Sequence, residues 1–323
     1  MSRTEVQHYQ LGAWLHNRAG YRGGVTKSHY SLNDDLQLAL RLADAADAIS
    51  RERFLAMDLE VTTKPDKTPV TDADRAVEQA LMDILATERG NDYLLGEEFG
   101  EQAGLLAEHP VTTADHPHRQ WIIDPIDGTS NFLRGVPVWA TLISLAIDGV
   151  PVIGVVSAPA LGKRWWASKG NGAWVDESND PLAKVPLPEG LSSMIEQPMV
   201  AIAEPRRLSV SGVKTLADAS LSYNSLQQWD QAGYLTELVE LSRKVWRTRA
   251  YGDMWSYMMV AEGILDIAGE FDLKPYDMAA LMPIVTEAGG TFTAVTGEAD
   301  VWHGSALATN GALHQTVLEQ LAK

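Results

Sequence analysis

The sequence of 323 residues contains no cysteine. This absence excludes thiolate nucleophiles, cysteine-ligated zinc and a disulfide framework, and it fits a reducing compartment. Long hydrophobic runs are also missing, because the longest apolar stretch, at about residues 138–147, ends at Asp148, well short of the roughly 20 residues of a membrane span. The first twenty residues lack the apolar core of a signal peptide. We therefore expect a soluble, cytoplasmic protein that does not enter a membrane.

Positive charge is scarce as well. The chain has 26 lysines and arginines against 43 aspartates and glutamates, a net charge of −17. Proteins that bind nucleic acid neutralise phosphates with basic side chains, so this balance argues against a nucleic-acid partner. A small phosphorylated substrate is compatible with it, provided that a cation lies between protein and phosphate. The sequence also has no P-loop, dinucleotide-binding or HExxH motif.

The length predicts about two domains. Residues 1–30 carry four basic residues against one acidic residue and are expected to form a flexible arm. An α+β domain with a large antiparallel sheet is expected over 31–185, and an α/β domain over 186–323, because a Pro- and acid-rich stretch separates them. In the second domain, helix-like segments alternate with short apolar strands. These segments lie at about 211–219, 230–243, 252–263, 277–289 and 311–322.

The most informative segment runs from Trp121 to Phe132 and reads WIIDPIDGTSNF. An apolar strand delivers Asp124 to its end, where Pro125 stops the sheet ladder. Asp127 follows three residues later, before a probable helix start at 128–130. Two carboxylates on one turn can share a hard divalent cation, and a helix N-terminus binds anions. The alternative is an acid-rich turn with a helix cap, but the combination favours a metal next to a phosphate.

Two carboxylates about 4 Å apart repel each other by roughly 4 kcal/mol at an effective dielectric constant of 20. A phosphate dianion beside them increases the repulsion. A site of this kind, in a chain of net charge −17, is therefore predicted to need Mg²⁺ to hold its substrate.

Three ordered motifs resemble the inositol monophosphatase superfamily of Mg²⁺-dependent phosphatases. They are Gly96-Glu-Glu, the Asp124-Pro-Ile-Asp-Gly-Thr-x-Asn-Phe segment, and Tyr276-Asp-x-Ala-Ala followed by Ile-Val-x-Glu-Ala-Gly-Gly. The similarity runs from about residue 32 to 322. Within the superfamily, the segments that begin at Thr63 and Arg249 look most like the actinobacterial histidinol-phosphate phosphatases.

The resemblance implies a set of metal ligands. Glu97, Asp124 and the backbone carbonyl of Ile126 would hold a first Mg²⁺, and Asp124, Asp127 and Asp277 a second. A weaker third ion would lie near Glu97, and Mn²⁺ is a possible substitute. Two ions of this kind lie on both sides of an in-line displacement at phosphorus.

The resemblance also implies the catalytic and phosphate-binding residues. Asp74 would act with Thr129 to orient and deprotonate the attacking water, and Glu97 would take part through its metal. The amides of Gly128, Thr129 and Ser130 would bind the phosphate. The superfamily fold is a layered αβαβα sandwich, and its members are commonly homodimers, so we expect both here.

Several candidates have a structural alternative. Asp72 and Asp74 could be the N-cap and a first-turn acid of a helix; we expect Asp72 to be the cap and Asp74 to be functional. Asp277 is expected both to cap a helix and to bind metal. Glu97, taken alone, could be a charged residue leaving a strand.

The substrate depends on two further acids. Glu270 lies at the superfamily's spacing before Asp277 for a substrate-contacting acid. Asp253 stands where inositol phosphatases usually carry a small uncharged residue, and it suits the α-ammonium group of histidinol phosphate. It could equally be the N-cap of a helix over 254–263. An inositol phosphate, a sugar phosphate or a nucleotide 3′-phosphate is the rival substrate, and a non-catalytic scaffold with the same fold is the rival function.

Overall fold

The computed structural model describes residues 30–64, 68–102, 118–177 and 204–323. Residues 31–323 form one compact unit, and residues 1–30 a separate one. The expected arm, residues 1–30, lies outside the described residues apart from Tyr30, and the expected boundary between 185 and 186 lies outside them as well. Among the described residues, no helix has both the length and the apolar character to cross a membrane.

The first layer is a pair of helices, α1 (Leu32–Arg53) and α2 (Asp72–Glu88). Both begin at a capping box, in which the hydroxyl of Ser31 or Thr71 accepts a backbone N–H and the acid three residues later bonds back. Leu38, Leu42 and the apolar face of α2 are buried against one face of a large sheet. The buried residues recur at helical spacing, so each helix turns one apolar face toward the sheet.

The large sheet has eight strands in the order β10-β9-β8-β7-β6-β5-β3-β4. Their bounds are β3 (Tyr93–Gly96), β4 (Gly100–Gln102), β5 (Arg119–Asp127), β6 (Ala140–Ile147), β7 (Val150–Ala158), β8 (Lys163–Ser168), β9 (Ala173–Asp176) and β10 (Arg206–Arg207). Neighbours are antiparallel except β3 and β5, which run parallel with Gly96 opposite Ile123. Glu97, the first residue after β3, therefore lies beside Asp124 of β5. A separate hairpin pairs β1 (Val61–Thr63) with β2 (Pro69–Thr71).

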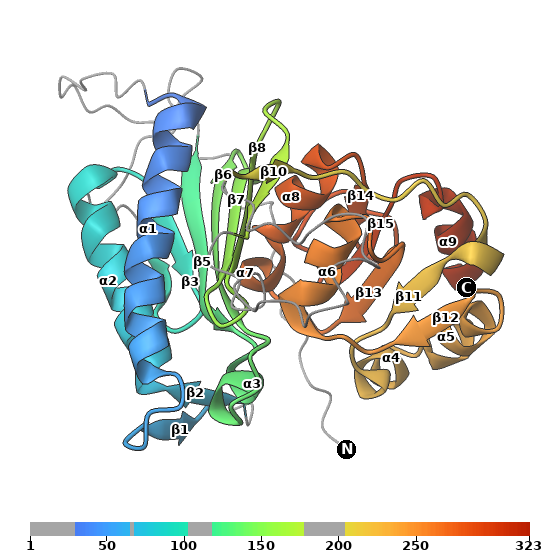
Figure 1. Ribbon diagram of the computed structural model, residues 1–323, viewed down its shortest axis with the longest axis horizontal. Coiled ribbons are helices and arrows are strands. Elements are labelled where there is room, and N and C mark those ends of the chain that lie inside the picture. The colour runs from blue at the N-terminus through green and yellow to red at the C-terminus, as the bar shows by residue number, and fades with distance from the viewer. Residues whose placement is uncertain (1–29, 65–67, 103–117, 178–203) are drawn as a thin grey trace, which may run out of the picture. The chain divides into compact units, whose positions relative to one another are not determined.

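A second sheet has five strands in the order β12-β11-β13-β15-β14. Its strands are β11 (Ser220–Ser222), β12 (Arg247–Arg249), β13 (Ile267–Phe271), β14 (Thr291–Thr293) and β15 (Ser305–Thr309). The helices of this part are α4 (Leu226–Gln231), α5 (Leu235–Ser242), α6 (Asp253–Ala261), α7 (Pro275–Met278), α8 (Leu281–Glu287) and α9 (His314–Leu321). In Figure 1, α6 and α8 lie between the two sheets, while α4, α5 and α9 lie beyond the smaller one.

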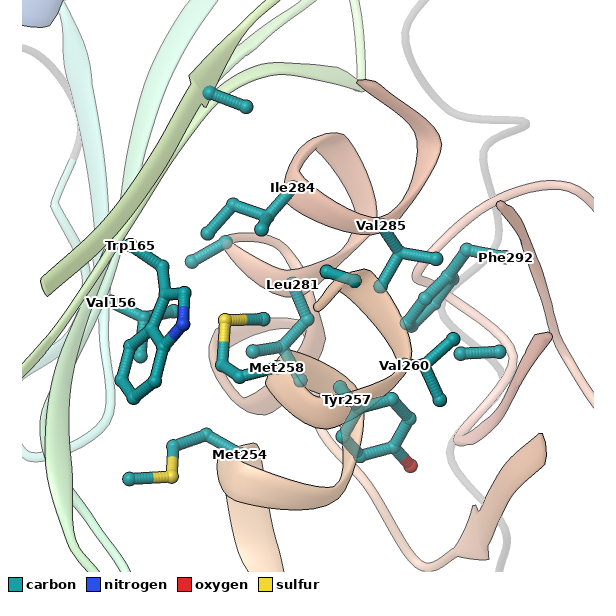
Figure 2. Packing of buried hydrophobic residues seen from close by; sticks show 14 of the residues in the cluster. Val156, Trp165, Met254, Tyr257, Met258, Val260, Leu281, Ile284, Val285 and Phe292 are labelled. Carbon is teal, nitrogen blue, oxygen red and sulfur yellow. The ribbon is translucent and has the colours of Figure 1, made fainter. Parts of the chain in front are cut away.

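One hydrophobic core joins the two sheets through these central helices. Figure 2 shows Trp165 of the large sheet facing Met258 and Leu281, with Phe292 of the smaller sheet on their far side. The layers therefore follow the order helix, sheet, helix, sheet, helix. The predicted αβαβα sandwich is confirmed.

Three helix predictions in the second half are wrong in their bounds. The segment 211–219 is not an α-helix, because Ser211 bonds to Asp266 and the Val213 carbonyl accepts from Asn310; only the 3₁₀ turn Leu216–Asp218 forms. The segment 230–243 is split into α4 and α5 near Gly233, whose φ is 78°. The segment 277–289 is likewise split into α7 and α8.

Candidate metal and phosphate site

Three acidic side chains from distant parts of the chain meet at the edge where β5 ends. Asp124 and Asp127 belong to the last residues of β5, and Asp277 is the third residue of α7. Each offers an oxygen within 4.8 Å of the others. The sequence motif alone joins only Asp124 and Asp127, so the contact with Asp277 is a product of the fold.

Asp127 and Asp277 are held in place by hydrogen bonds from backbone amides. The Lys274 amide donates to Asp277 over 2.6 Å, and the Met254 amide donates to Asp127 over 2.8 Å. Asp124 is 2 % exposed, and its Oδ1 has no hydrogen-bond partner among the described residues. A buried carboxylate oxygen without a partner costs free energy that a bound cation would offset.

The electrostatics point the same way. Burial, followed by the charges of Glu97, Asp127 and Asp277, raises the pKa of Asp124 well above its ordinary value. Burial and the neighbouring acids also raise the pKa of Asp127, and raise that of Asp277 to about 7. Within the described part of the chain, no lysine or arginine forms an ion pair with these three carboxylates. Among the described residues these charges therefore have no ion-paired cation, and the more distant charge of Lys274 only partly opposes the rise that burial causes in the pKa of Asp277.

A second acidic group adjoins the first. Asp74, Glu97 and Glu98 also place one oxygen each within 4.8 Å of one another, and the side chains of Glu97 and Asp124 are within hydrogen-bonding reach. Here a protein cation is present, because the ammonium group of Lys64 lies 2.7 Å from Glu97 and 2.6 Å from Glu98. Among the described residues, the second acidic group therefore has an ion-paired lysine, whereas the first has no ion-paired lysine or arginine.

Asp74 and Thr129 lie together beside these acids. Thr129 Oγ1 is 3.3 Å from Asp74 Oδ1 and 3.0 Å from the carbonyl of Ile126. The other oxygen of Asp74 accepts from the amide and the hydroxyl of Thr71, at 2.8 and 2.5 Å. Burial is the largest cause that raises the pKa of Asp74, to about 6. Thr71 thus fixes the Asp74 carboxylate with its other oxygen, Oδ1, facing the Thr129 hydroxyl.

The short helix α3 (Thr129–Leu133) begins next to Asp127. Gly128 is its N-cap with φ 84°, a left-handed conformation that disfavours other residues. An added Cβ there would also lie 3.0 Å from the Val138 carbonyl. The first amides of a helix have no partners within it, so the amides of Thr129 and Ser130 are available for an anion.

Asp253 lies directly against this turn. An added Cβ at Gly128 would lie 3.5 Å from Asp253 Oδ2, and the Asp253 charge helps to raise the pKa of Asp127. The amide group of Asn131 donates to Asp253 over 2.7 Å and to the Val138 carbonyl over 2.9 Å. Burial raises the pKa of Asp253, and the Asn131 hydrogen bond opposes this. Asp253 is therefore a positioned carboxylate at the edge of the site.

Glu270 lies on β13 and is 9 % exposed. It accepts hydrogen bonds from the Asn224 side chain and, over 3.3 Å, from the Tyr257 hydroxyl. Burial, followed by the charges of Asp253 and Asp277, raises its pKa to about 8. The charges of Asp253 and Glu270 are thus coupled to those of Asp127 and Asp277.

The structure corrects the expected helix caps. Asp72 is not a cap, because Thr71 caps α2 and Asp74 completes its capping box. Instead, Asp72 forms an ion pair with Arg53. Asp253 is the first residue of α6 and Gly252 is its N-cap, and α7 has its N-cap at Lys274 rather than at Asp277.

Besides Thr71, Met254 and Lys274, five residues in contact with the site acids were not among the candidates. Asn131 lies within the central motif and could have been found there, and Lys64 lies in a segment that carries the resemblance. Asn224 and Tyr257 carry no such signal, since only the fold brings them to Glu270. The fifth is Glu98.

Comparisons with known proteins agree with this arrangement. Residues 32–323 match the model of the inositol monophosphatase family. The chain is 49 % identical over 289 residues to a protein of Mycobacterium tuberculosis named histidinol-phosphatase, covering 90 % of this chain and 98 % of the relative. It is 48 % identical over 292 residues to a Streptomyces coelicolor protein of the same name, covering 89 % and 97 %.

A solved structure supports the fold. The extragenic suppressor protein suhB from Bartonella henselae superimposes with a TM-score of 0.71 at 26 % identity, over 90 % of this chain and 98 % of that one. The family match, the two relatives and the shared fold show together that the chain belongs to the inositol monophosphatase family of phosphatases.

Proposed function

We propose that the protein hydrolyses L-histidinol phosphate to L-histidinol and phosphate, a step of histidine biosynthesis, with Mg²⁺ as cofactor. The observation that carries the reaction class is the meeting of Asp124, Asp127 and Asp277 without an ion-paired lysine or arginine among the described residues. The names of the two similar relatives support the substrate, and so does the carboxylate of Asp253 beside the phosphate-binding turn.

The residues fit a divalent cation. Carboxylate and carbonyl oxygens are the ligands that Mg²⁺ prefers, and Asp124 Oδ1 is a buried oxygen in need of a partner. Glu97, Asp124 and the Ile126 carbonyl would hold one ion, and Asp124, Asp127 and Asp277 another. A third would lie near Glu97, and Mn²⁺ would substitute. When bound, the ions would neutralise the acids, activate water and stabilise the leaving oxygen.

The proton is handled by side chains of the chain itself. Asp74 Oδ1 faces Thr129 Oγ1, while Thr71 holds Asp74 Oδ2. A water that donates to Thr129 would be directed at the phosphorus, and Asp74 would accept its proton. Water attacks in line, the ester P–O bond breaks, and the leaving oxygen takes up a proton. General-base help of this kind contributes about 10²–10⁴-fold to the rate.

The substrate is oriented at both ends. The amides of Gly128, Thr129 and Ser130 would bind the phosphate oxygens at the start of α3. Asp253 would accept a charge-assisted hydrogen bond from the α-ammonium group, worth about 1.5–3 kcal/mol, and Glu270 would contribute a second acidic contact. Asn131 fixes the Asp253 carboxylate over 2.7 Å.

Phosphate release from a panel of phosphomonoesters tests the proposal. The panel contains histidinol phosphate, inositol 1-phosphate, a sugar phosphate and a nucleotide 3′-phosphate, each with Mg²⁺ and with EDTA. We expect Mg²⁺-dependent turnover with the highest kcat/KM on histidinol phosphate, and an inactive Asp124→Asn control. A preference for the inositol ester would favour the rival substrate, and no turnover on any ester would favour a scaffold.

Asp253→Asn separates the substrates. It keeps the size of the side chain and removes its charge, so we expect kcat/KM for histidinol phosphate to fall by about tenfold or more. Turnover of glycerol phosphate, which has no amine, should change little. An equal loss on both esters would remove the ammonium contact from the proposal.

The homodimer and the cytoplasmic location stay predictions. Light scattering of the purified protein tests the first, and fractionation of the source cells tests the second. A monomer that hydrolyses histidinol phosphate at full rate would contradict only the dimer.

A further inference from the structure

The ammonium group of Lys64 joins two acidic side chains at the edge of the site. It lies 2.7 Å from Glu97 Oε1 and 2.6 Å from Glu98 Oε1. The side chains of Lys64, Glu97 and Glu98 are 19 %, 17 % and 5 % exposed, so the pairs are largely shielded from water. Ion pairs in such a position are screened less by salt than pairs on the surface.

The backbone places Lys64 there from a separate element. Lys64 follows the last residue of β1, and its amide donates to the Thr68 carbonyl over 2.8 Å. The acids follow β3, at the edge of the large sheet. The ion pairs therefore connect the β1–β2 hairpin to the loop that carries Glu97.

The ammonium group lies beside a group of acids that could bind a metal ion. Asp74, Glu97 and Glu98 place their oxygens within 4.8 Å of one another, and Glu97 is within hydrogen-bonding reach of Asp124. Glu97 Oε1 forms an ion pair with Lys64. The same carboxylate also faces the first acidic group, in which no carboxylate has an ion-paired lysine or arginine among the described residues. Magnesium binds carboxylates at about 2.0–2.1 Å, so an ion on this oxygen would bring two positive charges close together.

We propose that Lys64 is a tethered counter-ion, which offsets part of the charge of Glu97 and Glu98 in the metal-free protein and is displaced when a divalent ion binds Glu97. The inference rests on the metal dependence of the proposed function. It has two consequences of opposite sign: Lys64 stabilises the metal-free protein and weakens the binding of the ion that it competes with.

Solvent can reach the exchange site. A pocket of about 570 Å³ is lined by Lys64, Glu97 and Glu98 together with Thr62, Thr63, Val70 and Arg75. An incoming ion can therefore approach Glu97 from the side on which Lys64 lies. The displaced ammonium group can move into the same space.

The test uses the full-length protein freed of metal with EDTA and then dialysed. Lys64→Met keeps the length of the side chain and removes its charge, and Lys64→Arg keeps the charge. Lys169→Met is the control for net charge. Lys169 is an exposed residue that directly follows β8. It lies at one end of β7 and β8, and Thr141 lies near the other end of these strands. Mn²⁺ binding is measured by electron paramagnetic resonance, and thermal unfolding by circular dichroism.

We expect Lys64→Met to bind one Mn²⁺ about tenfold more tightly than the wild type. Its metal-free Tm should be lower, and the difference should vanish at saturating Mn²⁺. Lys64→Arg and Lys169→Met should resemble the wild type in both measurements. Unchanged or weaker Mn²⁺ binding by Lys64→Met, with Mn²⁺ bound by the wild type, would overturn the inference and leave the proposed function intact. No Mn²⁺ binding by either protein would overturn both.

Discussion

Glu78 lies directly beneath Gly96. A Cβ added at Gly96 would come within 1.8 Å of Glu78 Oε1. The Glu78 carboxylate accepts the amides of Glu98 and Phe99 at 2.8 and 3.0 Å. The glycine therefore allows a buried acid on α2 to hold the loop that presents Glu97.

Gly96→Ala is the first prediction. The added methyl group must push Glu78 away from the amides of Glu98 and Phe99, since overpacking of a well-packed site costs about 1–3 kcal/mol. We expect a lower Tm and weaker Mn²⁺ binding. Gly212→Ala is the matched control, because nothing lies within 4 Å of a Cβ at Gly212 and its φ needs no glycine. A Gly96→Ala protein with the stability and metal affinity of the wild type would contradict the close contact.

Glu78→Gln tests the hydrogen bonds themselves. The amide replaces one accepting oxygen by a donor, so one of the two backbone amides loses its partner, at a cost of about 1–3 kcal/mol. We expect a drop in Tm and a rise in the Mg²⁺ concentration that gives half-maximal activity. Glu240→Gln, at a side chain 53 % exposed on α5, should change neither. The prediction fails if both substitutions have the same small effect.

The stability of the metal-free protein should fall as the pH rises above about 6.5. Glu78 and Asp277 have pKa values raised to about 7, and Glu270 to about 8, whereas unfolded carboxylates titrate near pH 4. In this range the folded state binds more protons than the unfolded state, so raising the pH favours unfolding. The loss of stability that these acids cause is absent below about pH 4 and complete above about pH 8.

Thermal unfolding at pH 6.5, 7.5 and 8.5 measures this effect, with EDTA or with Mg²⁺. We expect the Tm in EDTA to decrease across the series and the gain from Mg²⁺ to grow. Burial lowers the pKa of the half-buried His118 and of the buried His314, so their contribution to stability rises with pH, in the opposite direction to that of the acids, and it is nearly complete above their ordinary pKa of about 6.5. A Tm in EDTA that rises with pH would show that these acids are not destabilising.

Asn131→Ala should act through Asp253. The substitution removes the hydrogen bond of 2.7 Å that holds the Asp253 carboxylate. We expect about a tenfold loss of kcat/KM on histidinol phosphate and a smaller loss on glycerol phosphate. In the Asp253→Asn background the same substitution should cost much less, and a double-mutant cycle measures the difference. Additive effects would mean that Asn131 has a separate role.

The sequence and the family resemblance single out Asp124, Asp127 and Asp277, and the structure brings these three residues together; their role as metal ligands stays a prediction. Asp124 and Asp127 lie on either side of Pro125, and Asp277 lies in the first turn of a helix, so their types and spacing are visible without coordinates. The prediction that Pro125 stops the sheet ladder is wrong, because β5 continues to Asp127 past an irregularity in its pairing with β6. The layered architecture follows from helical and strand periodicity together with the resemblance. The residue types, their spacing and the periodicity can each be recognised within a short segment of the sequence.

The contacts between the site acids and residues distant in sequence are not visible in this way. Asn224 reaches Glu270 because β11 and β13 pair in parallel, Leu221 opposite Ile267, and a parallel register is set by the whole sheet. Lys64 meets Glu98 across two separate elements. The failed helix at 211–219 has the same cause, since hydrogen bonds to Asp266 and Asn310 outweigh local propensity.

The core that joins the two sheets through α6 and α8 has a consequence for synthesis on the ribosome. A nascent chain that ends before α7 carries Asp124 and Asp127 but not Asp277, and it lacks the strands β14 and β15 that complete the smaller sheet. The mutual repulsion of the three carboxylates therefore arises only when the final segment docks. Under the proposed metal dependence, ion capture would coincide with this last step of assembly.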